Sequence, residues 1–391
     1  MSSTPIRVAI VGGGLGGLSA AIALLQQGME VTVFEQADSL GEVGAGVFIY
    51  PNSLRMLERA GLGPALAEVG AKVGPGSEYY RMDGSVVGKV VTADSAGWNG
   101  MYGMHRADLL GVFAARVPQG RVRTGHRCVG FAQDGRTATV HFANGARFEA
   151  DLVIAADGIH SSLQKYVVEP SPPIYSGFRA YRGLLAMSDL PGWRERAHQV
   201  WMGDGKHFMV FPVRRGELVN YVGFVPTKSQ TIESWSAIGD RDELAASYAG
   251  WDPRLTALLS KVRNCFWWGL YDRKPLANWS NGRLLLLGDA AHPMLPHLGQ
   301  GANQAIEDGF ALAIFLARRD AAEIPTILPR YQAFRSARTD IVQAEARRNG
   351  QRYNSQYESL EQRDREVANA AELRAWFYDY DVGAAATLAA A

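Results

Sequence analysis

The stretch of the sequence with the most chemical potential is GDAAHPMLPHLGQG, residues 288–301. It contains one acid, Asp289, two histidines, His292 and His297, and two prolines, and it runs into a segment whose apolar residues have helical spacing. An acid with two histidines is compatible with a metal site or with part of a catalytic triad. A glycine-containing loop before a helix is also typical of a cofactor-binding loop, because a helix N-terminus attracts anions. These residues alone leave the three possibilities open.

A glycine-rich turn near the N-terminus is the second chemical signal. Gly12, Gly14 and Gly17 form the pattern G-x-G-x-x-G between a short apolar run and a helix-like segment. Such glycines permit a tight turn, close approach of a pyrophosphate and packing of the helix on the strand. Glu35 stands at the end of the next predicted strand, where a carboxylate accepts a hydrogen bond from a ribose hydroxyl. The pattern predicts dinucleotide binding, and the acid favours FAD or NAD over NADP.

The elements that must position these motifs are spread along the chain. Apolar runs that indicate buried parallel strands occur near the N-terminus, near residue 154 and near residue 286. Between the last two, from Phe178 to about Tyr271, aromatic and β-branched residues alternate, which indicates a mostly antiparallel sheet with one helix pair. We therefore predict an α/β fold, with a Rossmann-type nucleotide-binding domain interrupted by a β-rich substrate domain and followed by C-terminal helices.

The predicted domain boundaries follow from this pattern. The nucleotide-binding domain comprises residues 1–72, 101–172 and 276–330. The substrate domain comprises residues 73–100 and 173–275, and the C-terminal helices comprise residues 331–391. A short meander is expected where Asp134-Gly135 and Asn144-Gly145 give hairpin signals. The final residues, VGAAATLAAA, are small and featureless, and we expect them to be frayed.

Composition excludes several classes of protein. The 391 residues are 47% hydrophobic and 20% charged, as in ordinary globular domains, and the net charge of +1 argues against a nucleic-acid or anionic-membrane partner. The two cysteines, Cys128 and Cys265, form neither a disulfide framework nor a metal-ligand spacing. With no signal-peptide pattern and no apolar run of about 18 residues, we expect a cytoplasmic protein without a metal.

Three motifs, in order, identify a family resemblance that covers nearly the whole chain: GGGLGG…FEQ, AADGIHS and GDAAHPMLPHLGQGANQAIEDG, with HRADL between the first two. Together they resemble the single-component FAD-dependent aromatic hydroxylases, the class A flavoprotein monooxygenases that include salicylate hydroxylase, 3-hydroxybenzoate 6-hydroxylase and 6-hydroxynicotinate 3-monooxygenase. The resemblance implies that NADH or NADPH binds transiently and reduces FAD. O₂ then forms a flavin C4a-hydroperoxide, which hydroxylates a small phenolic or heteroaromatic substrate, expected to carry a carboxylate and to belong to aromatic catabolism or a tailoring pathway.

The resemblance also implies roles in cofactor binding. Gly12, Gly14 and Gly17 would hold the pyrophosphate of FAD, and Glu35 would hold its adenosine ribose. Arg106 would lie along the FAD, and Asp157 belongs to the motif shared between FAD and nicotinamide binding. In the third motif, Asp289 would accept a hydrogen bond from the ribityl chain and Pro296 would lie beside the isoalloxazine ring. Gly299, Gly301 and Ala302 would face the N1/C2=O edge of that ring. The last role has a physical basis, because reduced flavin is anionic at that edge and a helix N-terminus stabilises an anion.

One position departs from the family pattern. The second motif usually carries arginine three residues after its serine, whereas here Ser161 is followed by Gln164. The departure puts the strength and specificity of NAD(P)H binding in question.

A general base is expected near the substrate hydroxyl, because phenols react as phenolates. His207, in GKHFMVFP, matches a histidine of the family and is the first candidate; the alternative is a satisfied core histidine. His297, in the cofactor-facing loop, is the second candidate. We interpret His292 and His160 as structural.

The substrate pocket is predicted to be apolar. Phe48 and Phe211 stand where relatives carry a histidine and a tyrosine, so decarboxylative hydroxylation of 6-hydroxynicotinate is disfavoured. Tyr50 and Pro296 complete the predicted pocket. A substrate carboxylate has three candidate partners, although ordinary salt bridges are the favoured interpretation of each: Arg179, Arg182 and Arg214. The aromatics Trp201, Trp267, Trp268 and Tyr271 are interpreted as core.

Two alternatives remain at this point. The same fold could serve a flavin oxidase or epoxidase with a non-aromatic substrate, or a nucleotide-binding escort protein without turnover. A metal centre or a triad at residues 288–301 is disfavoured, because no third ligand and no nucleophile stand at useful spacing. We expect a monomer or homodimer.

Overall fold

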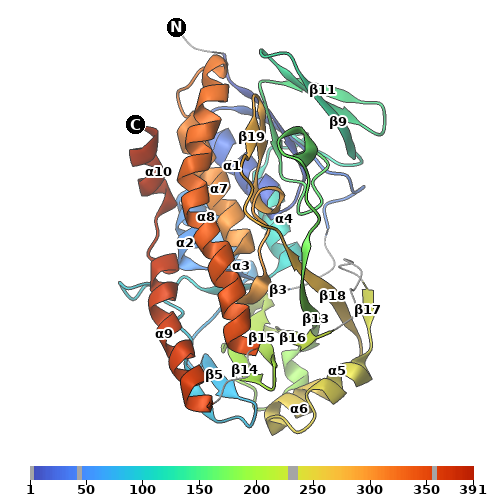
Figure 1. Ribbon diagram of the computed structural model, residues 1–391, viewed down its shortest axis with the longest axis vertical. Helices are drawn as coiled ribbons and strands as arrows, with labels where there is room; N and C mark the ends of the chain where they lie inside the picture. Colours follow the sequence, from blue (N-terminus) through green and yellow to red (C-terminus); the bar gives the residue numbers. More distant parts are fainter. Residues whose placement is uncertain (1–3, 42–45, 228–236, 355–358) are drawn as a thin grey trace.

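The computed structural model describes residues 4–41, 46–227, 237–354 and 359–391. Figure 1 shows an elongated molecule with one sheet system in the upper half and a second in the lower half, joined by a long helix that runs beside both. The fold is α/β, as predicted from the sequence.

The upper half contains a six-stranded sheet assembled from distant parts of the chain. Its order is β19–β20–β12–β1–β2–β8, with bounds Ser280–Asn281, Leu284–Leu286, Leu152–Ala155, Arg7–Val11, Glu30–Phe34 and Val122–Arg123. All neighbouring pairs are parallel except β19–β20. The central strands are almost continuous apolar runs because helices or other chain segments cover both faces of a parallel sheet. The three strands expected from the apolar runs are β1, β12 and β20.

Helices and a meander surround this sheet. The helices are α1 (Leu15–Gln26), α2 (Pro51–Arg59), α3 (Gly63–Val69), α4 (Arg106–Arg116) and α7 (Gly301–Leu316). The predicted meander is an antiparallel sheet of β9 (Cys128–Gln133), β10 (Ala138–Phe142) and β11 (Arg147–Ala150), seen at the upper right of Figure 1. Its two turns place Gly135 and Gly145 at positive φ, as the Asp-Gly and Asn-Gly pairs predict.

Close contact between α1 and α7 depends on a glycine. A Cβ at Gly309 of α7 would lie 2.7 Å from Cα of Ala20 and 2.8 Å from its backbone nitrogen. We expect Gly309→Val to lower the free energy of unfolding by about 1–3 kcal/mol, because backbone atoms must separate. Thermal unfolding measures this change. Gly111→Val in α4, where a Cβ meets nothing within 4 Å, is the control; an equal loss of stability in both variants would contradict the packing argument.

The lower half contains an eight-stranded, mostly antiparallel sheet. Its order is β17–β18–β13–β16–β15–β14–β5–β6, with bounds Ala237–Gly239, Cys265–Asp272, Ile174–Ala186, Leu218–Pro226, Lys206–Val213, Gln199–Gly203, Glu78–Arg81 and Val86–Lys89. The expected helix pair is α5 (Arg241–Ser247) and α6 (Pro253–Leu259). A small sheet of β3 (Gly46–Ile49), β7 (Tyr102–His105) and β4 (Ala71–Lys72) connects the two halves, because β7 also contacts β15.

Three C-terminal helices complete the fold: α8 (Ile324–Asn354), α9 (Leu360–Tyr378) and α10 (Val382–Ala390). Helix α8 packs on α7 above and on β14 and β15 below, so it spans both halves (Figure 1). The structure gives no test of the predicted domain boundaries, which remain a prediction.

The prediction of a frayed C-terminal tail is wrong. Residues 382–390 form α10, which packs on α7 and α2 with Val382 and Ala386 fully buried. Small side chains permit this close approach, and Asp381 caps the helix by accepting from the backbone N–H of Ala384 at 3.1 Å. The same carboxylate binds Arg59 of α2 at 2.8 Å, so the contact that orders the tail is tertiary.

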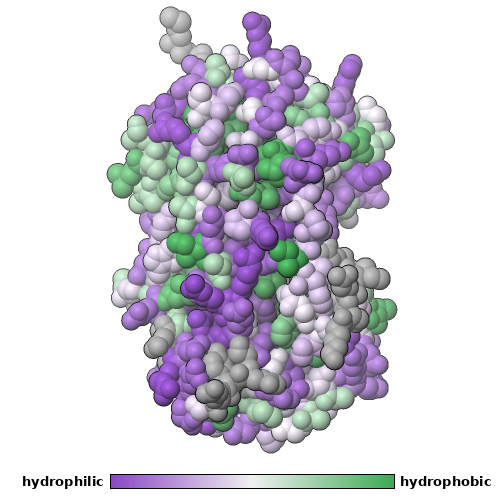
Figure 2. All heavy atoms as spheres, viewed as in Figure 1, coloured by the Kyte–Doolittle hydropathy of each residue, from purple (hydrophilic) through white to green (hydrophobic). Residues whose placement is uncertain are grey.

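The surface mixes polar and apolar groups. Figure 2 shows hydrophilic and neutral residues over most of the visible face, with apolar residues in scattered small groups. Among the described residues, no helix has the length and apolar character needed to cross a membrane.

Candidate active site

Two cavities meet between the halves of the molecule. The larger, of about 550 Å³, lies along the carboxyl ends of β1, β2 and β12 and the start of α7. The smaller, of about 200 Å³, lies against the eight-stranded sheet. Four residues line both cavities: Arg106, Asp289, Gly301 and Ala302. The third motif therefore stands at the junction, where one ligand can extend from one cavity into the other.

The turn between β1 and α1 forms one wall of the larger cavity. Gly12 has a φ of +111°, and a Cβ there would lie 2.2 Å from the carbonyl oxygen of Ala156, so the position requires glycine. A Cβ at Gly17 would lie 2.0 Å from the carbonyl oxygen of Gly12. A Cβ at Gly14, by contrast, meets no atom within 4 Å, and no side chain caps the helix that begins there. The uncapped N–H groups of α1 thus face open space suited to a pyrophosphate.

Two carboxylates, Glu35 and Asp157, line the larger cavity and can contact parts of a flavin dinucleotide other than its pyrophosphate. Glu35 accepts from the backbone N–H groups of Gly13 and Ala37 at 2.8 and 2.9 Å, which orients it at the end of β2. Asp157 accepts from Ser162 through Oδ2, whereas its buried Oδ1 has no partner among the described residues. Burial raises the pKa of Asp157. The glycine turn, the ribose-site acid and this orphaned oxygen fit FAD.

We expect Gly14→Val to weaken FAD binding without unfolding the protein. The new side chain points into the space for the pyrophosphate and meets no protein atom at its Cβ. A tenfold loss of affinity corresponds to about 1.4 kcal/mol, and we expect at least that. FAD retained after gel filtration, with circular dichroism as the folding check, measures it. Gly111→Val is the control; a variant that keeps full FAD content would show that Gly14 does not border the cofactor.

Gln164, at the position of the family arginine, has a structural role here. Its side chain is buried and donates to the carbonyl oxygen of Ala290 at 3.1 Å, which ties the second motif to the third. Arg273, which follows β18, donates to the carbonyl oxygen of Ile159 at 2.9 Å in the same loop. An amide therefore supports the loop geometry, and the loop has a second support from an arginine elsewhere in the chain.

The junction carries one charge of each sign. Arg106 begins α4 and Asp289 lies in the turn Gly288–Ala290. Burial lowers the pKa of Arg106, while the nearby Asp289 raises it. Burial raises the pKa of Asp289, opposed by His292 and Arg106. These groups suit polar atoms of a ribityl chain and flavin edge.

The interpretation of His292 as a structural residue is confirmed, because its Nε2 lies 2.6 Å from Oδ2 of Asp308, which is buried in α7. That same Oδ2 accepts from the backbone N–H of Gly288 at 3.0 Å. The turn that carries Asp289 is thus anchored to the middle of α7.

The smaller cavity has aromatic walls. Phe48 of β3 and Phe211 of β15 have ring centroids 4.0 Å apart, and Tyr50 lies 5.4 Å from Phe48. Phe224 and Pro296 also line this cavity. The predicted pocket residues therefore come together, and they offer a flat apolar slot for a small ring.

The loop before α7 is built to face this slot. Pro296–Leu298 form one 3₁₀ turn, and Gly299 follows in the left-handed conformation at φ +67°. A Cβ at Gly299 would lie 2.7 Å from the Tyr50 hydroxyl. Asn303 holds the loop by donating to the carbonyl oxygens of Gly299 and Phe48, each at 3.0 Å.

His297 lies in the cavity wall and is chemically available. The side chain is buried, and its Nδ1 has no hydrogen-bond partner among the described residues. Burial lowers its pKa to about 4, so the ring is neutral at pH 7 and can accept a proton. Its ring centroid lies 5.3 Å from that of His207.

The structure does not bring His207 into the cavity, which corrects its expected role as the base in direct contact with substrate. His207 shares a face of β15 with Met209 and Phe211, but Phe224 stacks on it at 4.1 Å and covers it. Its Nδ1 lies 2.6 Å from Oδ1 of Asn354 in α8. Burial, followed by the nearby His297, lowers its pKa well below the ordinary value. His207 therefore lies one ring behind His297.

Arg182, one of the candidate partners of a substrate carboxylate, lines this cavity. His198 and Arg374, which the sequence did not single out, and Trp268, which was assigned to the core, line it as well. His198 precedes β14 and shares a strand face with Val200, another lining residue, so strand alternation offered a signal for it. Trp268 was interpreted as core, yet it lines the cavity with the Arg182 guanidinium 4.8 Å from its ring. Burial lowers the pKa of Arg182 to about 10. Arg374 comes from α9, and no local pattern marks it.

The other two candidate arginines form salt bridges, which is the interpretation favoured from the sequence. Arg179 pairs with Glu243 of α5, and Arg214 binds Asp108 of α4 at 2.7 Å. Neither lines the substrate cavity.

Comparisons with known proteins agree with this geometry. The family model for the FAD binding domain matches residues 5–348. A 3-amino-4-hydroxybenzoate 2-monooxygenase of Streptomyces platensis is 34% identical over 388 residues, which cover 97% of this chain and 98% of the relative. A salicylate hydroxylase of Pseudomonas putida is 33% identical over 380 residues, which cover 89% of this chain and 86% of the relative.

A solved structure of a salicylate hydroxylase substrate complex superposes with a TM-score of 0.86 and 31% identity, covering 98% of both chains. Other similar structures contain FAD. The paired cavities, the glycine turn and these matches place the chain in the family of FAD-dependent aromatic hydroxylases, flavin monooxygenases that take electrons from NAD(P)H.

Proposed function

We propose that this monooxygenase hydroxylates a small aromatic carboxylate that bears a ring hydroxyl. The ring carbon gains one oxygen atom from O₂, the second oxygen leaves as water, and NAD(P)H supplies the two electrons. FAD, when bound, supplies the oxygen-activating chemistry. The proposal rests mainly on one observation: the neutral His297, whose buried Nδ1 has no partner among the described residues, lines an aromatic slot that adjoins the flavin junction.

His297 is the proposed base. A phenol proton transferred to Nδ1 leaves a phenolate, whose ring is electron-rich and therefore reactive toward an oxygen electrophile. The neutral imidazole accepts the proton. His207 acts through His297 as a positioning residue, because its ring limits the orientations open to the His297 side chain.

The pocket walls support an aromatic substrate. Phe48, Phe211 and Phe224 can hold a ring by stacking and edge contacts. The cavity of about 200 Å³ suits one ring with small substituents. The relatives named above act, by their names, on 3-amino-4-hydroxybenzoate and salicylate, both hydroxylated benzoates, which supports a carboxylate on the substrate.

Substrate-stimulated NADH oxidation tests the function. Purified, FAD-loaded protein is incubated with hydroxybenzoates, aminohydroxybenzoates, hydroxypyridine carboxylates and their decarboxylated counterparts, and product mass is measured. We expect at least one ring-hydroxylated carboxylate to accelerate NADH oxidation and to gain one oxygen atom. An FAD-loaded enzyme that all members of the panel leave unstimulated would refute aromatic hydroxylation; oxygen gain only with non-aromatic alkenes would favour the epoxidase alternative.

A further inference from the structure

A buried arginine without a carboxylate partner lies at one end of the substrate cavity. Arg374 of α9 is 6% exposed, and among the residues that the structure describes no carboxylate lies within salt-bridge distance of it. Its Nη2 donates to the hydroxyl of Tyr353 at 3.1 Å. That hydroxyl lies 3.3 Å from the hydroxyl of Tyr79. Tyr50 and Tyr378 also interact with the guanidinium, but neutral phenols leave its charge uncompensated.

An uncompensated buried charge is costly and normally has an anionic partner. Buried Arg335, for example, contacts Glu307 at 2.8 Å. Buried Arg273 and Arg283 instead donate to backbone carbonyl oxygens and do not line the substrate cavity. Arg374 contrasts with these, although it lines the cavity that holds the substrate. The missing partner is thus best supplied by a ligand with a negative charge.

His198 adds a second polar group at the same end. Its side chain is 4% exposed, and neither ring nitrogen has a hydrogen-bond partner among the described residues. Burial, together with the nearby Arg374, lowers its pKa to about 3, so the ring is neutral and offers one donor and one acceptor. Phe48 packs against it at 4.8 Å. A substituent beside the ligand's anionic group can therefore find both kinds of hydrogen-bond partner here.

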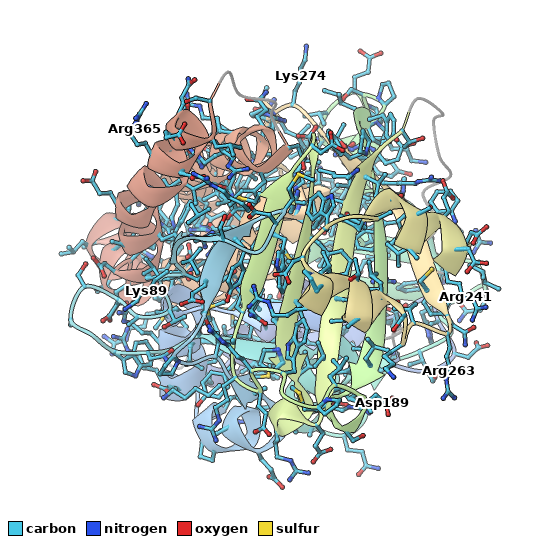
Figure 3. The ribbon with its side chains drawn as sticks, turned by 90° about the horizontal axis from the view of Figure 1, so that it is seen from below. Lys89, Asp189, Arg241, Arg263, Lys274 and Arg365 are labelled. Carbon is cyan, nitrogen blue, oxygen red and sulfur yellow. The ribbon has the colours of Figure 1, made fainter. Side chains whose placement is uncertain are left out.

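The outer side of Arg374 is also electropositive. It lines a further cavity of about 200 Å³ between β6 and α9, together with Lys89 and no acidic residue. Figure 3 shows Lys89 on the same side of the sheet as α9, which carries the labelled Arg365, whereas Arg241 and Arg263 lie at the opposite side. The described lining residues thus include two cations and no anion, which favours the approach of an anionic ligand.

We propose that Arg374, with the Tyr353 hydroxyl, binds the carboxylate of the substrate, and that His198 contacts the neighbouring ring substituent. This inference rests on the proposed function and assigns substrate orientation to the C-terminal helix α9. Arg182, the other cavity-lining arginine considered for this role, lies close enough to Arg106 for the two charges to repel, and its guanidinium packs on Trp268, so it belongs to the flavin side. A carboxylate at Arg374 and a hydroxyl at His297 would anchor two points of one ring.

Ligand binding with matched probes tests this assignment without turnover. The change in flavin absorbance is titrated with 3-amino-4-hydroxybenzoate and salicylate, and with their decarboxylated counterparts 2-aminophenol and phenol. In the FAD-loaded wild type we expect the carboxylates to bind about 10- to 100-fold more tightly, as for hydrogen bonds to charged groups. In Arg374→Met that preference should fall to about threefold or less while 2-aminophenol and phenol bind as before.

Two further variants make the result decisive. Arg182→Met is the matched control, a second buried cavity arginine, and it should keep the preference for carboxylates. Arg374→Lys keeps the charge and should keep part of the preference, which separates anion binding from loss of folding; FAD content and melting temperature check the fold. Preference that survives in Arg374→Met, that is lost in Arg182→Met, or that the wild type lacks would overturn the assignment. If no member of the wider panel of aromatic compounds stimulates NADH oxidation while the preference for carboxylates is intact, the proposed reaction alone is refuted.

Discussion

His297→Ala should reduce the rate of aromatic hydroxylation by about 10²- to 10⁴-fold, the range expected when a general base is removed. The variant should keep its FAD, because His297 lines the substrate cavity and not the larger one. The buried, unpartnered Nδ1 of His297 is the proton acceptor in this proposal. The rate of product formation, followed from about pH 6 to 9, measures the effect, and the loss should be smallest at high pH, where the free phenol ionises.

His141→Ala is the control, because His141 is exposed on β10 and lines neither cavity. It should leave hydroxylation unchanged. His207→Ala should have a smaller effect than His297→Ala and should shift the pH profile, since His207 acts through His297. If His297→Ala forms product at the wild-type rate across the whole pH range, the base is another group; if His207→Ala is the more damaging, the original expectation for His207 holds.

Arg335→Met should lower the free energy of unfolding by about 3–5 kcal/mol, the cost of leaving buried charges unpaired. Arg335 of α8 is fully buried and binds Glu307 and Asp308 of α7, each at 2.8 Å. Burial raises the pKa of Asp308, but His292 and Arg335 outweigh it and hold the pKa at about 2. Both acids have lowered pKa values in the wild type, and removing the arginine takes away one of the cations that offset their burial. Urea denaturation with and without FAD measures the loss.

The matched control is on the same helix. Arg348 of α8 pairs with Glu345 at 2.7 Å, but its side chain is 69% exposed, so Arg348→Met should cost at most about 1 kcal/mol. We also expect Arg335→Met to reduce FAD retention, because Asp308 holds the turn that carries Asp289. Equal stability losses at Arg335 and Arg348 would show that the buried network adds nothing to the fold.

Local pattern was sufficient for the nucleotide-binding elements. The turn at Gly12, Gly14 and Gly17 is marked by a glycine pattern that is local in sequence. A Cβ at Gly17 is excluded by the nearby carbonyl oxygen of Gly12 and a Cβ at Gly14 faces open space, whereas a Cβ at Gly12 is excluded by Ala156 from a distant part of the chain. The apolar runs of β1, β12 and β20 likewise predict buried strands without reference to the rest of the chain. The motif at residues 288–301 was recognised as a cofactor loop from the sequence too, through its resemblance to the family motif.

Long-range packing decided which side chains face the substrate. In sequence His207 is the first candidate base and His297 the second, whereas the structure covers His207 with the Phe224 ring and places His297 in the cavity wall. The tail from Val382 became a helix through contacts with α7 and α2 that its composition does not reveal.

The sequence by itself determined the fold class, the FAD site, the enzyme family and an aromatic pocket, because each depends on backbone conformations and strand or helix periodicity that act over short distances. The tertiary structure decided the polar ends of the pocket. His198 and Arg374 are separated by more than a hundred residues of sequence and meet only because α9 packs beside β6 near the strand that follows His198. The burial that gives these two groups their chemistry exists only once the helices and the sheet have come together.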